Sequence, residues 1–359
     1  MKLPELQRRK TLPVRVGDVI IGGGVPDGEP APVVIQSMTN TPTADVEATV
    51  AQVCALSEAG AGLVRVATPS PPDTAALRQI VTQSPVPIIA DVHFHFQRAL
   101  EAIDAGAAKV RLNPGNLSDQ RQVRRVIAAA AERGVAIRVG VNEGSVVNRR
   151  DQRQREADLA RPLDELMVEK LAEYLNIFET EGFSDIVLSA KTHDAVTTIA
   201  VNRALAARWD YPLHLGVTHA GTAATGTIRS AAALGALLSE GIGETIRFSY
   251  AGDPVEEVRA AKELLCSLRL RRREGIELIA CPGCGRGQMD IQPIVEEVSA
   301  ALEEFSNIQP ALTVAIMGCV VNGPGEAENA DVAICAGKDK AILYRRGRRL
   351  RTVPAEQIG

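Results

Sequence analysis

Residues 136–142 read AIRVGVN, a short run rich in β-branched residues that is typical of a buried parallel strand. Similar runs precede and follow it, separated by helical patterns: PVVIQSMT (32–39), GLVRVAT (62–68), VPIIADVH (86–93), KVRLNP (109–114), DIVLSAK (185–191), PLHLGVTHAG (212–221) and ETIRFSYAG (244–252). Alternation of strands and helices indicates a parallel sheet. Eight such units fill the length of a (β/α)8 barrel, so we predict an α/β fold with a TIM-type barrel over residues 1–268.

The chain after this barrel has a different order of elements. A strand precedes the CPGC segment at 281–284, a helical pattern lies near 293–305, and the apolar runs LTVAIMGC, DVAICAG and AILYRRGRRLRTV follow. The arginine-rich stretch SLRLRRREG (267–275) marks the junction. A chain of 359 residues also exceeds what one hydrophobic core usually organises. We therefore expect residues 269–359 to form a second, small α/β domain.

The overall composition excludes several classes of function. An apolar content of 45% with 23% charged residues is ordinary for a soluble globular protein. A net charge of -4 and an aromatic content of 3% argue against nucleic-acid binding, both as a basic surface and as a stacking platform. The N-terminus has no apolar signal core, and no stretch approaches the roughly 18 apolar residues of a spanning helix. We therefore expect a cytoplasmic protein that does not enter the membrane.

Three of the six cysteines fall in a pattern that indicates metal or redox chemistry. Cys281 and Cys284 form a CxxC pair after a strand, and Cys319 ends another strand. The turn at 322–325 brings Glu326 back toward the same point. Thiolates are soft ligands for iron-sulfur clusters or zinc, whereas a carboxylate is a harder and weaker ligand. Three cysteines with one glutamate favour a cluster with one exchangeable iron over a structural zinc site, which usually has four Cys or His ligands.

A structural zinc site with Cys335 as its fourth ligand is the alternative interpretation. The surroundings of the remaining cysteines favour buried, unreactive thiols. Cys54 and Cys266 lie in helical patterns, and Cys335 lies in an apolar strand.

Charged residues within the predicted barrel strands are the second functional signal. A charge inside a parallel strand is costly unless it is paired or meets a ligand. The period of two places Arg138 and Asn142 on one face, and likewise Arg247 and Ser249, so these side chains can converge on the C-terminal mouth. We call the five basic residues at these strands the cation cluster: Arg65, Arg111, Arg138, Lys191 and Arg247.

The cation cluster predicts a substrate of high negative charge. The acids near it in the sequence are few, chiefly Asp91, Glu143 and Asp253, so positive charge remains unmatched. A diphosphate is the natural candidate, because arginine and lysine bind phosphate oxygens well. The alternative is that the arginines bridge strand ends to acids on the surrounding loops.

Asp91, His93 and His95 alternate onto one face at the end of a predicted strand. A His-x-His pair at such a position can bind a metal. A metallohydrolase would need further ligands on later strands, yet these offer Arg, Asn and Ser. We therefore predict that Asp91 and His93 are polar substrate contacts, with hydrogen bonding to loops as the alternative.

Several long motifs occur in one order along the chain: QSMTNT, KVRLNPGN, IRVGVN, LHLGVT, LLSEGIGETIR, CPGCGR and MGCVVNGPGEA. From about residue 9 to residue 345 the chain resembles the 4-hydroxy-3-methylbut-2-enyl diphosphate synthase family. The resemblance implies a role in the methylerythritol phosphate route to isoprenoids. In that reaction 2-C-methyl-D-erythritol 2,4-cyclodiphosphate is opened and reductively dehydrated with two electrons through a 4Fe-4S cluster.

The resemblance also implies roles for particular residues. It implies that Cys281, Cys284, Cys319 and Glu326 are cluster ligands. It implies that the cation cluster, with Asn142, Thr218 and Ser249, holds the diphosphate. Many relatives read Thr-Glu-Ala-Gly where this chain has His219 after Thr218. If that glutamate donates protons, His219 would have to replace it, which an imidazole can do near neutral pH.

The family further implies partners. Its two-domain members are homodimers in which the barrel mouth of one chain faces the cluster domain of the other. The resemblance implies flavodoxin or ferredoxin as electron donor, and two basic stretches are candidate docking surfaces for it, with an ordinary solvated surface as the alternative. They comprise Arg269, Arg271, Arg272 and Arg273, and Arg345, Arg346, Arg348, Arg349 and Arg351. The competing hypotheses are a non-redox barrel enzyme with structural zinc and a non-catalytic iron or redox sensor.

Overall fold

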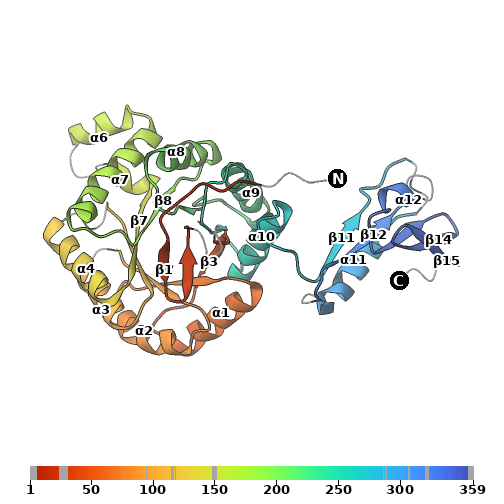
Figure 1. The fold of residues 1–359 in the computed structure, drawn as a ribbon, viewed down its shortest axis with the longest axis horizontal. Helices are drawn as coiled ribbons and strands as arrows, with labels where there is room; N and C mark the ends of the chain where they lie inside the picture. Colours follow the sequence, from red (N-terminus) through yellow and green to blue (C-terminus); the bar gives the residue numbers. More distant parts are fainter. Residues whose placement is uncertain are drawn as a thin grey trace. The chain divides into compact units, whose positions relative to one another are not determined.

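The protein divides into two compact units, Met1–Arg271 and Arg272–Gly359, which are described separately below (Figure 1). The computed structural model describes residues 6–23, 31–93, 95–114, 117, 119–147, 152–285, 287, 289–305, 308–319 and 323–354. Within these ranges the side chains of residues 152–155, 303 and 326 are not described. No helix in the described ranges is both long enough and apolar enough to span a membrane.

The first unit is a parallel barrel, which confirms the predicted fold class. Its strands are β3 (Val34–Met38), β4 (Leu63–Ala67), β5 (Ile88–Asp91), β6 (Lys109–Leu112), β7 (Ala136–Asn142), β8 (Ile186–Lys191), β9 (His214–Leu215) and β10 (Thr245–Ile246). They pair in the order β8-β7-β6-β5-β4-β3-β10-β9. A parallel bridge between Leu188 and Leu213 joins the two ends of this sheet. The carboxyl ends of all eight strands therefore face one mouth.

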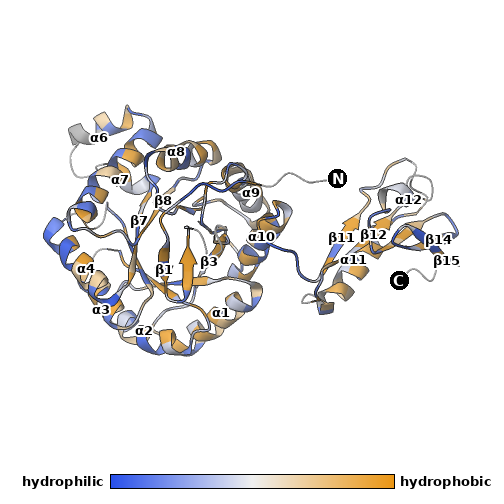
Figure 2. Cartoon of the chain, in the orientation of Figure 1, coloured by the Kyte–Doolittle hydropathy of each residue, from blue (hydrophilic) through white to orange (hydrophobic). Residues whose placement is uncertain are grey.

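Helices surround the strands in a ring (Figure 1). Local sequence sets their ends: Asp45, Asp194 and Thr222 each accept a hydrogen bond from the first turn of a helix, and Gly60 ends α1 with a φ of 114°. Hydrophilic residues are frequent on these helices, whereas β1 within the ring is hydrophobic (Figure 2). The helices are α1 (Val46–Ala59), α2 (Pro71–Gln83), α3 (Phe96–Asp104), α4 (Gln120–Arg133), α5 (Glu143–Val146), α6 (Gln152–Leu159), α7 (Leu163–Thr180), α8 (Ala195–Arg208), α9 (Ala223–Ser239) and α10 (Pro254–Ser267).

A short hairpin of β1 (Val14–Val16) and β2 (Val19–Ile21) closes the other end of the barrel. Our sequence interpretation began the repeats at about residue 30 and did not include it. Val14, Val16 and Ile21 are fully buried. They form one apolar cluster with residues from the beginnings of the barrel strands, among them Val34 and Leu63. This cluster seals the amino ends of the strands, so the opposite mouth is the place for a ligand.

The second unit is a five-stranded sheet with short helices. Its strands are β11 (Ile276–Ala280), β12 (Leu312–Met317), β13 (Val332–Ala336), β14 (Lys340–Arg345) and β15 (Arg348–Pro354), paired in chain order. β11, β12 and β13 run parallel, and β14 and β15 are antiparallel. The run AILYRRGRRLRTV thus forms two strands, because Arg346 and Gly347 turn the chain with φ values of 48° and 72°. Helices α11 (Gln292–Leu302) and α12 (Gly323–Glu326) and the 3-10 turn Glu303–Phe305 complete the unit.

Candidate active site

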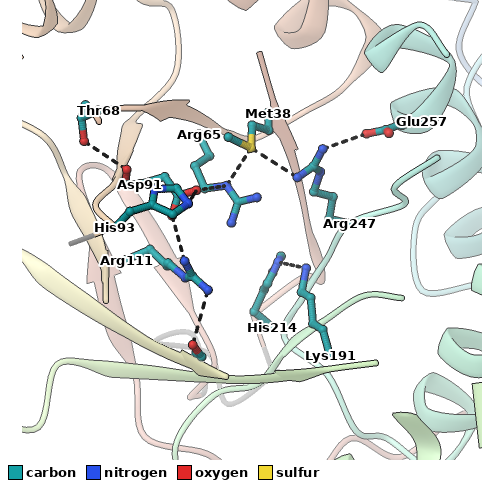
Figure 3. Close-up of polar contacts among 11 residues, drawn as sticks. Met38, Arg65, Thr68, Asp91, His93, Arg111, Lys191, His214, Arg247 and Glu257 are labelled. Atoms are coloured by element: carbon teal, nitrogen blue, oxygen red, sulfur yellow. Dashed lines mark hydrogen bonds and ion pairs between the residues drawn. The ribbon is translucent and has the colours of Figure 1, made fainter. Parts of the chain in front are cut away.

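The barrel mouth holds a polar cavity of about 180 Å³. All ten side chains predicted as substrate contacts line it. Figure 3 draws part of this lining, including Asp91, Arg111 and Arg247. Ser189 and Val217 complete the lining. The predicted residues in the lining are Arg65, Asp91, His93, Arg111, Arg138, Asn142, Lys191, Thr218, Arg247 and Ser249.

Asp91 is the buried carboxylate closest to several of these cations. Its Oδ1 lies 3.4 Å from Nη1 of Arg111, and its Oδ2 lies 3.9 Å from Nε of Arg65 and 3.9 Å from Nε2 of His93. Burial alone would raise the pKa of this carboxyl. The neighbouring Arg65, Arg111, His93 and Arg138 outweigh burial and lower the pKa of Asp91 to about 2. Asp91 is therefore ionised at neutral pH and orders the cations around it.

Glu257 of α10 is a second buried carboxylate, and the sequence interpretation missed it. Its Oε2 lies 3.4 Å from Nη2 of Arg247, and the other carboxylate oxygen accepts a hydrogen bond from the amide of Tyr250 at 3.0 Å. The two other acids that lie near the cation cluster in the sequence have other partners. Glu143 contacts Nδ1 of His193 at 2.7 Å on the exposed rim, and Asp253 caps α10. Among the described residues, the carboxylates that pair with the cation cluster are Asp91 and Glu257.

The cation cluster keeps hydrogen-bond donors that are not used within the described part of the chain. Arg138 is 1% exposed, and its Nε and Nη1 atoms have no acceptor there. The Nε atoms of Arg111 and Arg247 also lack an acceptor in the described residues. Burial, followed by the neighbouring arginines, lowers the pKa of Arg138 well below its ordinary value. Buried donors of like charge without acceptors are costly, and an anion in the cavity would satisfy them.

Met38 and Lys109 also belong to this region, although the sequence interpretation did not select them. The sulfur of Met38 accepts from Nε of Arg65 at 3.1 Å and from Nη1 of Arg247 at 3.4 Å, and so it bridges the two arginines. Lys109 is fully buried, two residues before Arg111 on β6. The alternation that found Arg111 could have found Lys109 as well.

The structure does not bring His219 into the cavity. His219 is exposed on the rim beside Thr218, in a left-handed conformation with a φ of 53°, and it is not one of the lining residues. His95 is also exposed and precedes α3. His93 lines the cavity and His95 does not, although alternation had placed both on one face.

The second unit places the three predicted cysteine ligands near one edge of its sheet. Cys281 directly follows β11, and its amide donates to the carbonyl oxygen of Ile316 in the parallel neighbour β12 at 2.9 Å. Cys319 lies two residues beyond the end of β12. Because the two strands are parallel neighbours in register, both thiols leave the sheet at the same edge. Cys284 is exposed on the loop that follows Cys281.

The surroundings of Cys281 fit a thiolate ligand. The amide of Gly283 donates to its sulfur at 3.4 Å. A cavity of about 400 Å³ opens here, and Cys281, Pro282, Gly283, Gly287 and Gly318 are among its lining. Gly318 lies beside this thiol, since a Cβ there would stand 4.0 Å from the Cys281 sulfur, in ordinary van der Waals contact. The donor set and the space suit a cluster, although the described side chains do not form a closed set of three metal ligands.

Glu326 ends the short helix α12, and its side chain lies outside the described part of the chain. Cys335 is fully buried on β13 in an apolar cluster with Ala315, Met317 and Ala333. This packing favours the interpretation of Cys335 as a structural thiol over a role as a fourth zinc ligand. Cys54 and Cys266 lie on α1 and α10, as the helical patterns indicated, but both are half-buried and not fully buried as we expected.

Comparisons with known proteins cover both units. A family model described as the GcpE TIM-barrel domain matches residues 11–262, and one described as the GcpE protein C-terminal domain matches residues 277–359. Curated relatives named "4-hydroxy-3-methylbut-2-en-1-yl diphosphate synthase (flavodoxin)" match nearly the whole chain. The protein from Corynebacterium diphtheriae is 46% identical over 352 residues, which cover 98% of this chain and 86% of that protein. The one from Geobacter sulfurreducens is 46% identical over 347 residues, covering 97% and 94%.

Proposed function

Because the chain belongs to the GcpE family of 4-hydroxy-3-methylbut-2-en-1-yl diphosphate synthases, we propose how its residues share the work of that reaction. The protein is an oxidoreductase that converts 2-C-methyl-D-erythritol 2,4-cyclodiphosphate to 4-hydroxy-3-methylbut-2-enyl diphosphate in isoprenoid precursor biosynthesis. The observation that carries the assignment of the substrate site is the single cavity lined by the cation cluster.

In this proposal the cation cluster binds the diphosphate of the substrate. Arg138, Arg111 and Arg247 keep buried donors for phosphate oxygens, and planar guanidinium groups bind such oxygens in pairs. Asp91 and Glu257 hold Arg111 and Arg247 in place rather than neutralise the whole cluster. Asn142, Thr218 and Ser249 supply neutral polar groups at the same mouth, and His93 with Asp91 meets the sugar-derived part. Fixing the substrate in this way removes part of the entropic barrier.

We further propose that Cys281, Cys284, Cys319 and Glu326 hold one 4Fe-4S cluster. The shared edge of β11 and β12, the amide of Gly283 directed at the Cys281 sulfur and the adjacent cavity support this assignment. When bound, the cluster supplies the two electrons of the reductive ring opening. The barrel residues do the remaining work: they bind the diphosphate, orient the ring and shield the reacting carbon from water. His219, on the exposed rim, is our candidate for protonating the departing oxygen.

The names of the relatives support flavodoxin as electron donor, and we propose that it docks on the arginines of the β14–β15 hairpin. The first basic stretch already has local partners: Arg271 donates to the carbonyl oxygen of Gly60 at 3.3 Å, and Arg273 contacts Glu277 at 3.5 Å. Arg345, Arg348 and Arg351 are exposed and suit an acidic partner better. We also propose a homodimer in which the barrel mouth of one chain faces the cluster domain of the other.

The test is an anaerobic assay of the purified full chain with the cyclodiphosphate and a chemical reductant. Formation of the linear diphosphate, together with about four iron and four sulfide per chain, is the expected result. One zinc per chain without iron, and no consumption of the cyclodiphosphate, would support the non-redox barrel enzyme instead. Iron without turnover would support the sensor.

A further inference from the structure

Beneath the cavity, a chain of three buried side chains ends at a member of the cation cluster. Nζ of Lys191 on β8 lies 3.0 Å from Nε2 of His214 on β9, and Nδ1 of His214 lies 2.8 Å from Oγ1 of Thr245 on β10 (Figure 3 draws the first contact). His214 and Thr245 are fully buried, and Lys191 is 8% exposed. Only Lys191 of the three lines the cavity. His214 therefore contacts the lining from behind and is not itself positioned to touch a ligand.

When Lys191 is charged, as it is beside a bound anion, the chemistry of the three groups sets the direction of these hydrogen bonds. An ammonium group has three donors and no acceptor, so Nε2 of His214 must accept from a charged Lys191. The proton of a neutral imidazole then resides on Nδ1, which donates to Oγ1 of Thr245. The ammonium of Lys191 thus selects the tautomer, and Oγ1 of Thr245 stabilises it by accepting from Nδ1. Removing the threonine hydroxyl would take this acceptor away from the buried Nδ1–H group and orient the imidazole less firmly.

The charges around the pair explain why Lys191 needs such an acceptor. Lys191 is surrounded by Arg138, Arg65, Arg247 and Arg111, and burial, then these four cations, lower the pKa of Lys191 well below its ordinary value. Burial, then Lys191 and the nearby cations Arg138, Lys109 and Arg65, lower the pKa of His214 well below its ordinary value. The imidazole is therefore neutral and remains an acceptor. It offsets part of the repulsion without adding a carboxylate that would compete with a bound anion.

The backbone leaves room for the ammonium group at one position. A Cβ on Gly216 would lie 2.7 Å from Nζ of Lys191 and 2.9 Å from the carbonyl oxygen of Arg247. Glycine is therefore required opposite the ammonium, because any larger residue would displace Lys191 or the backbone at Arg247, just after β10. Gly216 and His214 lie on the same face of the chain at β9, so one segment supplies both the acceptor and the space.

We propose that His214, oriented by Thr245, is a positioning residue that holds the Lys191 ammonium against the diphosphate site, so that two of its three donors face the ligand. The inference rests on the proposed function, since it takes the cavity to be the diphosphate site. It assigns to β9 and β10 a part in binding that the lining residues alone do not reveal.

The test compares His214→Phe, which keeps the ring and removes the acceptor, with His214→Gln, whose side-chain oxygen can accept near the position of Nε2. Inorganic diphosphate binding to the full chain is measured by calorimetry, and KM and kcat are measured in the anaerobic assay. We expect His214→Phe to weaken diphosphate binding and raise KM by about ten- to a hundredfold, as for a lost hydrogen bond to a charged group. His214→Gln should recover most of the loss.

A double-mutant cycle with Lys191→Met separates positioning from a general loss of structure. If His214 acts through Lys191, His214→Phe in the Lys191→Met background should weaken diphosphate binding by less than about twofold. Thr245→Val should weaken diphosphate binding by less than His214→Phe does. Thr245→Ser should bind diphosphate as tightly as the unchanged protein. Ser230→Ala, at a fully buried hydroxyl on α9, is the matched control for burial and should leave binding unchanged.

Two results would overturn the inference: additive losses in the cycle, or equal losses in His214→Phe and His214→Gln while both variants keep the melting temperature of the unchanged protein. Both differ from a failure of the proposed function. In that case the unchanged protein itself would neither bind inorganic diphosphate nor turn over the cyclodiphosphate.

Discussion

Asp91 and Arg111 stand side by side on neighbouring barrel strands, paired in register, with Oδ1 of the first 3.4 Å from Nη1 of the second. Both side chains are about 5% exposed. This ion pair is buried in a region where arginines and lysines outnumber carboxylates. Removing one partner of such a pair leaves an uncompensated charge, which is more costly than removing both. The stability of the empty barrel therefore depends on Asp91 more than on any surface carboxylate.

We predict that Asp91→Asn destabilises the protein without ligand by about 2 kcal/mol at neutral pH. The sign follows from the pKa of about 2 in the folded state, which is below the ordinary value of 3.8. A depressed carboxyl pKa gives stability that is present above about pH 4 and is lost as the pH falls toward 2. Denaturant unfolding at several pH values should show that the free energies of unfolding of the two proteins converge in acid.

The control variant is Asp104→Asn, since Asp104 contacts Arg78 and Arg133 at 3.0 Å but is 62% exposed. This substitution should lower the free energy of unfolding by less than about 1 kcal/mol. An equal loss in both variants would contradict the argument.

We predict that Arg138→Met keeps the stability of the protein without ligand but weakens its binding of diphosphate. Removal of a buried cation with unused donors should leave the free energy of unfolding unchanged or raise it by about 1 to 4 kcal/mol. The same change should weaken the binding of inorganic diphosphate by about ten- to a hundredfold, because phosphate oxygens lose buried donors. Thermal unfolding with and without diphosphate measures both effects. A variant that is less stable and binds diphosphate normally would show that Arg138 is structural.

The sequence predicted the barrel because its eight strand runs are long, β-branched and regularly spaced. It did not predict the β1–β2 hairpin, whose three-residue strands give no periodic signal. Alternation within strands was enough to place Arg138 with Asn142, and Arg247 with Ser249, in the lining of one cavity. Glu257 could not be found in this way, because it reaches Arg247 from a helix that follows the strand. Tertiary packing decides which acid meets which cation, and position along the chain does not.

We predict that the protein takes up protons when it binds diphosphate. The pKa of Lys191 in the empty cavity is lowered by burial and by the surrounding arginines. A bound anion stabilises the charged form of Lys191 and so raises this pKa. The complex therefore holds more protons than the separate protein and diphosphate. Affinity should accordingly fall as the pH rises through the pKa of Lys191 in the complex. Calorimetry in two buffers of different ionisation enthalpy measures the uptake, and proton release, or the same enthalpy in both buffers, would contradict the prediction. Lys191→Met should reduce the uptake.

We predict that the cysteines of the second unit separate into two groups. Cys281→Ser and Cys319→Ser should lose most of the iron and sulfide, because a cluster held through few thiolates depends on each of them. Cys335→Ala should retain the iron and lose about 1 to 2 kcal/mol of stability, as expected for a small cavity beside Met317 and Ala333. Iron and sulfide analysis of anaerobically purified proteins is the measurement. Loss of metal from Cys335→Ala would return Cys335 to the ligand set and favour the zinc interpretation.

We predict that electron delivery by flavodoxin depends on the exposed arginines of β15. Arg348 and Arg351 are exposed on a strand at the edge of its sheet, where positive charge also prevents pairing with another chain. A docking surface for flavodoxin and an edge that resists pairing would both place arginines here. The two roles differ in how loss of the arginines affects turnover. If flavodoxin docks there, Arg348→Ser with Arg351→Ser should lower flavodoxin-driven turnover several-fold at low salt and leave turnover with a chemical reductant unchanged.

Arg121→Ser with Arg133→Ser is the matched control for that experiment, because it removes the same charge from α4 of the barrel. The difference between the two double variants should disappear as the ionic strength rises, since screening removes the attraction that the hairpin provides. Equal slowing in both variants would mean that flavodoxin responds only to net charge. A loss that is confined to the hairpin variant, does not depend on salt and also slows turnover with the chemical reductant would favour edge protection. A misfolded or aggregated sheet would slow turnover with either electron source.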